Sequence, residues 1–151
     1  FIVEVGDLQI RVLGTSFDVA AYANEPVVKT TLAEGAVQLS THGKRYTLRP
    51  GEQAHLNKST GEVGIAAANL KEVLAWKKGL FYFDNTGIRE IMREVARWYN
   101  ASVVYETTNT DHMLFSGVVS RYSDVDALLK RLELTSAVHF KVQGNRIIVM
   151  N

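Results

Sequence analysis

The sequence predicts a mainly β chain whose second half is α+β. Three observations predict this fold class. Apolar and polar residues alternate in short runs up to about residue 65, which is the pattern of strands that bury one face. Turn signals built on Gly and Pro separate these runs. Beyond residue 78, two segments carry apolar residues at helical spacing, so we expect an all-β domain over residues 1–73 and an α+β domain over residues 74–151.

The first domain is predicted to be a series of consecutive strands. The alternating runs lie at residues 8–12, 37–39, 46–48, 54–56 and 63–65. The turn signals between them are Glu34-Gly35, His42-Gly43, Pro50-Gly51 and Thr60-Gly61. Short turns favour antiparallel neighbours, so the domain is a β meander, a sandwich or a short solenoid. The chain opens on a strand-like segment at residues 1–5 without an initiator Met, so we interpret the sequence as a piece of a longer protein.

The second domain is predicted to contain a duplicated β-α-β unit. Residues 66–78 lack strand alternation and form a connector, and residues 80–83 form the next strand. Apolar residues at helical spacing follow in two copies, 37 positions apart: Ile88, Ile91, Met92 and Val95, then Val125, Leu128, Leu129 and Leu132. Thr86 and Ser123 are the predicted N-caps of the two helices. A terminal β-hairpin, with its turn at residues 143–145 and its last strand at residues 146–150, closes the domain.

Composition and charge exclude several classes of protein. The chain has 151 residues, of which 46% are hydrophobic and none is Cys. It has no apolar run of the roughly 18–20 residues that a membrane-spanning helix needs. Lys and Arg number 17 against 16 Asp and Glu, which gives a net charge of +1. Proteins that bind nucleic acid through phosphate contacts normally carry a strong basic excess, so that function is disfavoured.

No group of residues predicts catalysis. The four histidines are His42, His55, His112 and His139, and none is spaced three or four residues from another His or carboxylate on one predicted helix face. The absence of Cys removes thiol nucleophiles and Cys-based zinc sites. We therefore assign no catalytic, cofactor-binding or metal-ligating residue and do not expect an enzyme.

Binding is the function that remains. A sheet edge is a row of unpaired N–H and C=O groups that can accept a strand from a partner. The predicted hairpin strand at residues 146–150 suggests such an edge, with Arg146 and Ile148 as contact residues. Tyr82 must face opposite its neighbours in the strand, and we expect it to form an apolar partner-binding patch together with Tyr99.

Several sequence strings resemble one protein family. Residues 12–19 (VLGTSFDV), 31–37 (TLAEGAV) and 48–54 (LRPGEQA) resemble the periplasmic core of FecR-type anti-sigma factors. Residues 75–81 (AWKKGLF), 83–86 (FDNT), 115–117 (FSG) and 132–135 (LELT) resemble the adjoining C-terminal domain, which is common in Bacteroidetes members. That domain is similar to the short N-terminal domain of secretins and TonB-dependent transporters. Gly87 stands where the family usually has Pro at the first helical position.

The resemblance implies signalling by protein–protein contact. Family members cross the inner membrane once, and this chain corresponds to the periplasmic portion. The signalling domain of an outer-membrane TonB-dependent transporter contacts that portion. A cytoplasmic region that binds an extracytoplasmic-function sigma factor lies outside these residues. The relay then controls transcription of nutrient-uptake genes, and no cofactor, nucleic acid or membrane contact by this part of the chain is implied.

A second function stays open from the residues alone. Aromatic side chains are dense in the second half of the chain, and aromatic rings are stacking platforms for sugars. The alternative is therefore a periplasmic carbohydrate- or peptidoglycan-binding module.

Overall fold

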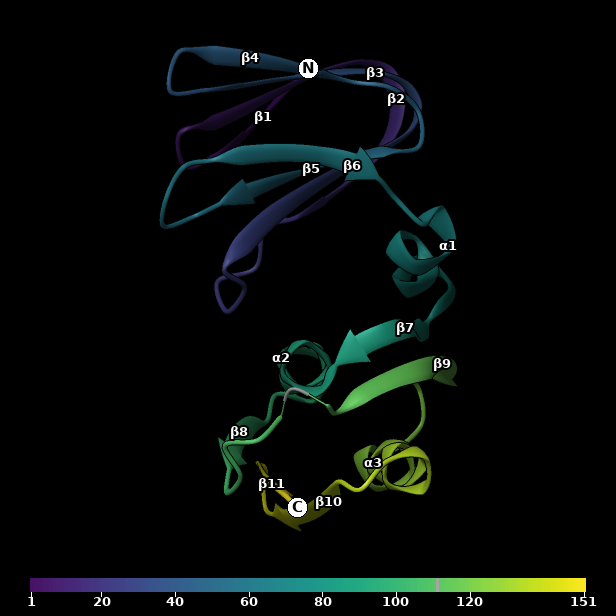
Figure 1. Ribbon diagram of the computed structural model, residues 1–151. Coiled ribbons are helices and arrows are strands. Elements are labelled where there is room, and N and C mark those ends of the chain that lie inside the picture. The colour runs from purple at the N-terminus through teal and green to yellow at the C-terminus, as the bar shows by residue number, and fades with distance from the viewer. Residues whose placement is uncertain (111) are drawn as a thin grey trace. The chain divides into compact units, whose positions relative to one another are not determined.

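The computed structural model describes residues 1–110 and 112–151 and divides into two compact units, Phe1–Leu74 and Ala75–Asn151 (Figure 1). The predicted fold class, mainly β with an α+β second half, is confirmed. The first unit contains β1 (Ile2–Val5), β2 (Leu8–Ala20), β3 (Val27–Thr41), β4 (Lys44–Leu48), β5 (Glu52–Asn57), β6 (Val63–Ala67) and α1 (Leu70–Val73).

The strands of the first unit form one antiparallel sheet that bends into two layers. The strand order is β1-β2-β3-β5-β6, and β4 also pairs with β3. Residues 27–31 of β3 pair with β5, and residues 37–41 pair with β4, so this long strand passes from one layer to the other (Figure 1). The antiparallel pairing of consecutive strands is that of the predicted meander, and the bend folds this one sheet into two layers, as in a sandwich (Figure 1).

The apolar faces of the two layers meet in one core. Alternation in strands turns every second side chain inward, so the runs found in the sequence supply the core directly. Its buried residues are Leu8, Ile10, Val12, Val28, Leu32, Val37, Leu39, Leu48 and Ala54. The opposite face of β2, β3 and β4 carries mainly polar residues, among them Gln9, Arg11, Gln38, Ser40 and Arg45.

Gly35 permits the bend where β2 and β3 leave regular pairing. The register of these two strands shifts between Leu13 and Phe17, opposite Gly35. Gly35 has φ +91°, and a Cβ atom on it would lie 2.4 Å from Cγ2 of Thr15. Only glycine fits both the left-handed backbone and the close approach of the neighbouring strand.

The second unit places two helices between two sheets. It contains a 3₁₀ helix η1 (Ala75–Lys78), then β7 (Leu80–Gly87), α2 (Ile88–Tyr99), β8 (Ser102–Tyr105), β9 (Leu114–Ser120), α3 (Val125–Thr135), β10 (His139–Gln143) and β11 (Arg146–Met150). Strands β7 and β9 form an antiparallel pair, and β10-β11-β8 form a three-stranded sheet. Helices α2 and α3 lie between these sheets (Figure 1), and a core of side chains from all three layers holds them together.

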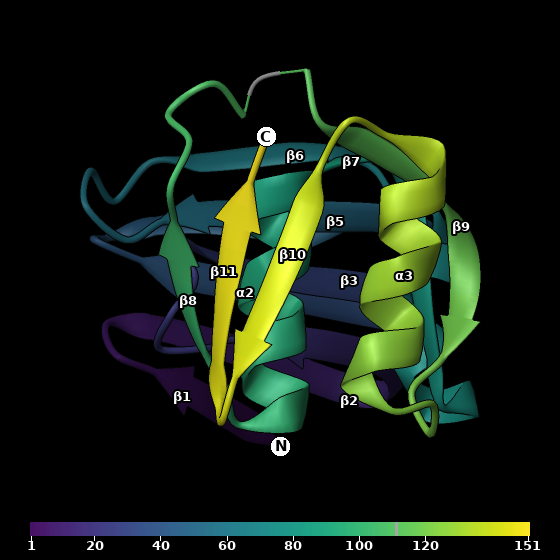
Figure 2. The same cartoon turned by 90° about the horizontal axis from the view of Figure 1, so that it is seen from below.

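The predicted repeat is visible in the helices. Helices α2 and α3 begin 37 residues apart, and so do β8 and β10, the strands that follow them. These two strands lie on opposite sides of β11, β8 parallel to it and β10 antiparallel (Figure 2). The duplication therefore repeats the local elements but not their pairing.

Both predicted N-caps are wrong by one residue. Gly87 is the N-cap of α2 and provides no side-chain cap, whereas Thr86 still belongs to β7. Asp124 caps α3, because its Oδ1 accepts a hydrogen bond from the backbone N–H of Ala127 at 2.7 Å. The cap must stand immediately before the first helical residue, and the helical spacing of apolar residues does not locate that residue to one position.

Candidate functional site

The predicted patch of Tyr82 and Tyr99 does not form. Phe81 and Tyr82 are neighbours in β7 and so face opposite sides of the sheet, with Phe81 in the core. Tyr99 stacks on Phe81 with ring centroids 6.3 Å apart, and its hydroxyl donates to the carbonyl of Ser123 at 2.6 Å. Tyr99 therefore packs on the core side, while Tyr82 lies on the outer face beside Val118, its partner in β9.

The predicted edge at β11 is also wrong. Strand β11 is the centre of its sheet, bonded to β10 on one side and β8 on the other (Figure 2). Ile148 is 6% exposed, and Arg146 donates to Oε1 of Gln143 across the hairpin at 2.7 Å. A hairpin signal shows which strands are joined by the turn, but not which strand lies at the edge. Arg146 and Ile148 cannot pair with a partner strand, because both edges of β11 are already bonded to strands of the same sheet.

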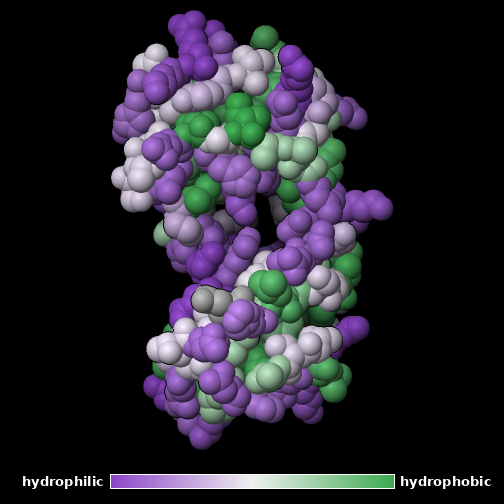
Figure 3. All heavy atoms as spheres, viewed as in Figure 1, coloured by the Kyte–Doolittle hydropathy of each residue, from purple (hydrophilic) through white to green (hydrophobic). Residues whose placement is uncertain are grey.

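Apolar exposure alone does not single out a partner surface. Apolar side chains reach the surface of both units (Figure 3), as they do in most soluble proteins. Large exposed examples include Leu13, Ile65, Trp98, Leu114 and Val118. The free strand edges are more informative, because their backbone groups must bond to something.

The edge of β10 is occupied by a side chain of the preceding helix. Oε1 of Glu133, on α3, accepts a hydrogen bond from the backbone N–H of Phe140 at 2.7 Å. In an antiparallel pair, outward-pointing backbone groups belong to every second residue, so Val142 is the next outward residue of this edge. A partner strand on β10 would have to displace the Glu133 carboxylate.

The edge of β7 is occupied in the same way by Arg121. The backbone N–H of Arg121 donates a hydrogen bond to the carbonyl of Gly79. Hydrogen-bonded pairs alternate along an antiparallel ladder, so the next bonded pair is Phe81 and Val119. The backbone N–H and C=O groups of Leu80 and Tyr82 therefore point outward, away from β9. The Leu80 carbonyl accepts a hydrogen bond from Nε of Arg121 at 3.0 Å.

Arg121 is held in place by two rings and a carboxylate. Its guanidinium carbon lies 4.2 Å from the ring centroid of Phe81 and 5.3 Å from that of Trp98. Its Nη2 donates to Oε1 of Glu94 on α2 at 2.6 Å. Burial raises the pKa of Glu94, and the charges of Arg121 and Arg97 lower it in part. This cluster ties α2 to the strand pair beneath it.

The edge of β9 has no such cap. The register places Val118 opposite Tyr82, so the backbone N–H and C=O of Val118 point away from β7, and those of Ser120 do the same. The Ser120 carbonyl accepts a hydrogen bond from the backbone N–H of Ser123 at 3.3 Å. Within the described residues, no side chain bonds to the outward N–H and C=O of Val118. Val118 and Leu114 are each 45% exposed on the outer face, beside the half-buried Tyr82. We call Tyr82, Leu114, Val118 and Ser120 the β9 surface.

The edge of β8 is shorter and more crowded. Strand β8 has four residues, against seven in β9. Ser102 and Glu106 bond toward β11, which leaves the backbone of Val103 and Tyr105 pointing outward. The Arg89 guanidinium lies 4.1 Å from the ring centroid of Tyr105 and its Nε donates to Thr110 at 3.0 Å. Among the described residues of this unit, β9 is therefore the longest strand with an edge that no side chain caps.

Sequence reasoning missed the β9 surface for a physical reason. The alternation over residues 114–120 is a visible strand signal. Which side of that strand stays unpaired depends on contacts with residues far away in the chain. The candidate residue that the sequence did identify correctly as outward-facing is Tyr82.

A further kind of site would be a group of side chains that could bind a metal ion. Residues 1–110 and 112–151 hold no group of three or more His, Asp or Glu side chains that could bind a metal ion. None of the helices in this same part of the chain is long and apolar enough to cross a membrane.

Over its whole length the chain is similar to two crystal structures of a candidate anti-sigma factor from Parabacteroides distasonis ATCC 8503. Both are 25% identical to it, with TM-scores of 0.86 and 0.85, and the chain covers 71% and 70% of theirs. Fold and likeness define the chain as part of a regulatory protein of the anti-sigma factor class.

The second unit matches a family model. Residues 80–149 match the family described as FecR, C-terminal. The predicted resemblance to FecR-type anti-sigma factors is confirmed. No curated protein matches the sequence.

Proposed function

We propose that this chain is the periplasmic, signal-receiving part of a single-pass inner-membrane anti-sigma factor. It receives a signal from the signalling domain of an outer-membrane TonB-dependent transporter. A cytoplasmic region outside these residues passes the signal to an extracytoplasmic-function sigma factor. The match of residues 80–149 to the FecR C-terminal family supports this role.

The observation that carries the proposal is the uncapped edge of β9. Its outward N–H and C=O groups can add a strand from the partner, and backbone pairing of this kind gives affinity without a deep pocket. The exposed Val118 and Leu114 and the neighbouring Tyr82 supply apolar contacts beside the new strand. The capped edges of β7 and β10 direct the partner strand to β9.

The test is calorimetric titration of the chain with the signalling domain of a TonB-dependent transporter from the same organism. Val118→Pro removes the outward N–H without touching the ladder to β7, and we expect binding to weaken at least about tenfold. Val142→Pro is the matched control, because it removes an outward N–H from the capped edge of β10. That variant should bind like the unmodified chain.

A second variant protects the test against misfolding. Val118→Lys keeps the backbone N–H and places a charge on the apolar outer face, where an edge Lys opposes strand addition. Retained binding by folded Val118→Pro and Val118→Lys would rule out the β9 surface. Absence of binding by the unmodified chain would rule out the transporter partner itself.

A sugar-binding role has one observation in its favour. Trp98 and Tyr122 are 45% and 82% exposed and lie next to each other, with ring centroids 6.3 Å apart. Their planes cross at 76°, so they do not form one flat stacking platform. Thermal shift with soluble peptidoglycan fragments tests this alternative, which requires a rise in melting temperature that Trp98→Ala abolishes.

A further inference from the structure

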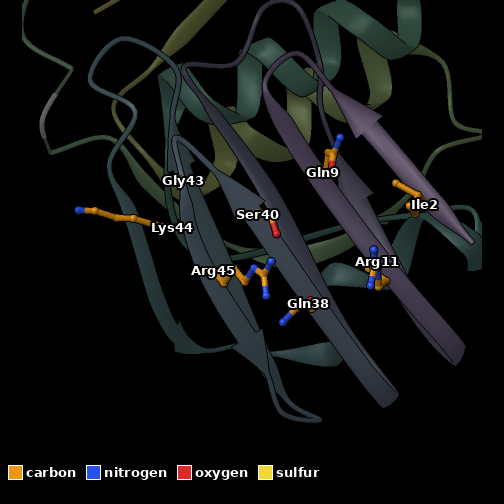
Figure 4. A pocket seen from close by; sticks show the side chains of 8 residues that line it. All are labelled: Ile2, Gln9, Arg11, Gln38, Ser40, Gly43, Lys44 and Arg45. Carbon is orange, nitrogen blue, oxygen red and sulfur yellow. The ribbon is translucent and has the colours of Figure 1, made fainter.

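The outer face of the first unit carries a polar basin that the signalling role does not use. It has a volume of about 300 Å³ and is lined by Ile2, Gln9, Arg11, Gln38, Ser40, Gly43, Lys44 and Arg45 (Figure 4). We call these residues the anion basin. They come from β1, β2, β3 and β4, which lie side by side in one layer, and from the turn that joins β3 to β4.

Strand pairing brings the basin residues together from distant parts of the sequence. Arg11 pairs with Gln38, and Ser40 pairs with both Gln9 and Arg45. Arg11 and Arg45 therefore stand on either side of β3, two strands apart, which is about 10 Å across the sheet. Figure 4 shows the side chain of Arg45 turned toward Gln38 over β3.

All the charged residues that line the basin are positively charged. Its lining includes Arg11, Lys44 and Arg45 and no carboxylate. Within the described residues, none of these three cations makes an ion pair. Glu4 lies just outside the lining and accepts only a long hydrogen bond, 3.5 Å, from Nε2 of Gln9. Unpaired guanidinium groups over a neutral polar floor are suited to an anion from outside the chain.

The side chains of the anion basin indicate which chemical groups its ligand carries. A guanidinium group binds a carboxylate or a phosphate through two parallel hydrogen bonds. The side-chain amides of Gln9 and Gln38 and the hydroxyl of Ser40 can each donate and accept, which suits hydroxyl groups on the same ligand. The volume is at the lower end for small-ligand pockets.

We propose that the anion basin binds a small sugar acid or sugar phosphate. The anionic group lies on Arg11 and Arg45, and the ligand hydroxyls lie on Gln9, Gln38 and Ser40. The site belongs to the first unit and is separate from the β9 surface, so it would give the chain a second input. If the anion basin bound no such ligand, the proposed contact of the β9 surface with the transporter would be unaffected.

The experiment is an NMR titration of the whole 151-residue chain with three matched probes. Glucuronate and glucose 6-phosphate carry the two anionic groups, and glucose is the neutral control. We expect both anions to shift the backbone amide signals of Gln38, Ser40 and Arg45 in a saturable manner. Glucose at equal concentration and equal ionic strength should leave these signals in place. The stronger of the two anions identifies carboxylate or phosphate as the preferred group.

Variants of the two arginines link binding to the basin. Arg11→Gln and Arg45→Gln remove charge at exposed positions of the sheet, and each should weaken binding about tenfold. Arg131→Gln is the matched control, since Arg131 is exposed on α3 in the other unit. The proposal would be overturned if glucose shifted the same signals equally, or if both basin variants bound the anions as the unmodified chain does. A parallel titration with phosphatidylglycerol vesicles tests a lipid surface as the ligand. Binding to these vesicles and to neither soluble anion would also overturn the proposal.

Discussion

Glu133 accepts a hydrogen bond from the backbone N–H of Phe140 at 2.7 Å, so a side chain of α3 occupies the free edge of β10. Phe140 lies seven positions after Glu133, and the loop between them returns the chain along its own helix. Natural sheets protect exposed edges in this way against pairing with other chains. The bond also fixes where β10 starts relative to the end of α3.

Removing the Glu133 carboxylate should open this edge. For Glu133→Ala we expect a loss of about 1 kcal/mol in the free energy of unfolding, because the hydrogen bond to Phe140 is lost. We also expect concentration-dependent self-association through β10. Urea unfolding and sedimentation velocity measure the two effects. Glu133→Gln keeps an acceptor oxygen at this position, and similar behaviour of the Ala and Gln variants would contradict the role of the bond.

The ion pair of Arg121 and Glu94 should show strong coupling. Arg121→Leu leaves the Glu94 carboxylate largely buried without its partner, and such a loss costs about 3 kcal/mol of stability. It also removes the ring contacts with Phe81 and Trp98 and the hydrogen bond to Leu80. Adding Glu94→Gln to Arg121→Leu should restore part of the loss. Thermal unfolding of the single and double variants measures this; a double variant less stable than Arg121→Leu would contradict it.

Glu94 should also give the stability a defined pH dependence. Burial raises the pKa of Glu94 above its ordinary 4.5, so between the ordinary and the folded pKa the native state binds more protons than the unfolded state. The Glu94 contribution to stability therefore falls as pH rises through this window. We expect the unmodified chain to lose stability relative to Glu94→Gln over that rise in pH. Urea unfolding of both proteins at several pH values checks the sign, and the opposite slope would contradict the raised pKa.

Gly35 should be the least replaceable glycine of the first unit. Gly35→Ala must hold an Ala at φ +91° and push its Cβ against Thr15, so we expect a loss of about 1–3 kcal/mol. Gly64→Ala is the matched control on β6, where an added Cβ meets nothing within 4 Å. Its stability should change by less than about 1 kcal/mol. Equal losses in the two variants, measured by urea unfolding, would show that the bend does not depend on Gly35.

Local patterns predict the elements of this fold well. The alternation at residues 8–12 correctly places Leu8, Ile10 and Val12 in the core, because neighbouring side chains of a strand must face opposite sides. The helical spacing from Ile88 and from Val125 correctly locates α2 and α3. These signals depend only on backbone geometry over a few residues. The two helix caps were missed because hydrogen bonds at one position decide them.

Local patterns in the sequence located most strands and both long helices, the apolar face of each, and the family that the chain resembles. They were wrong in placing a turn at Glu34-Gly35, which lies inside β3, and in assigning residues 66 and 67 to the connector, because these residues belong to β6. Three features emerge only in the folded chain: β11 is central in its sheet, β9 lies at the edge of its strand pair, and Arg11 and Arg45 flank one basin. The reason is that strand pairing joins residues far apart in the chain. The free energy that selects one pairing over another is spread over the whole core, so no local pattern records it.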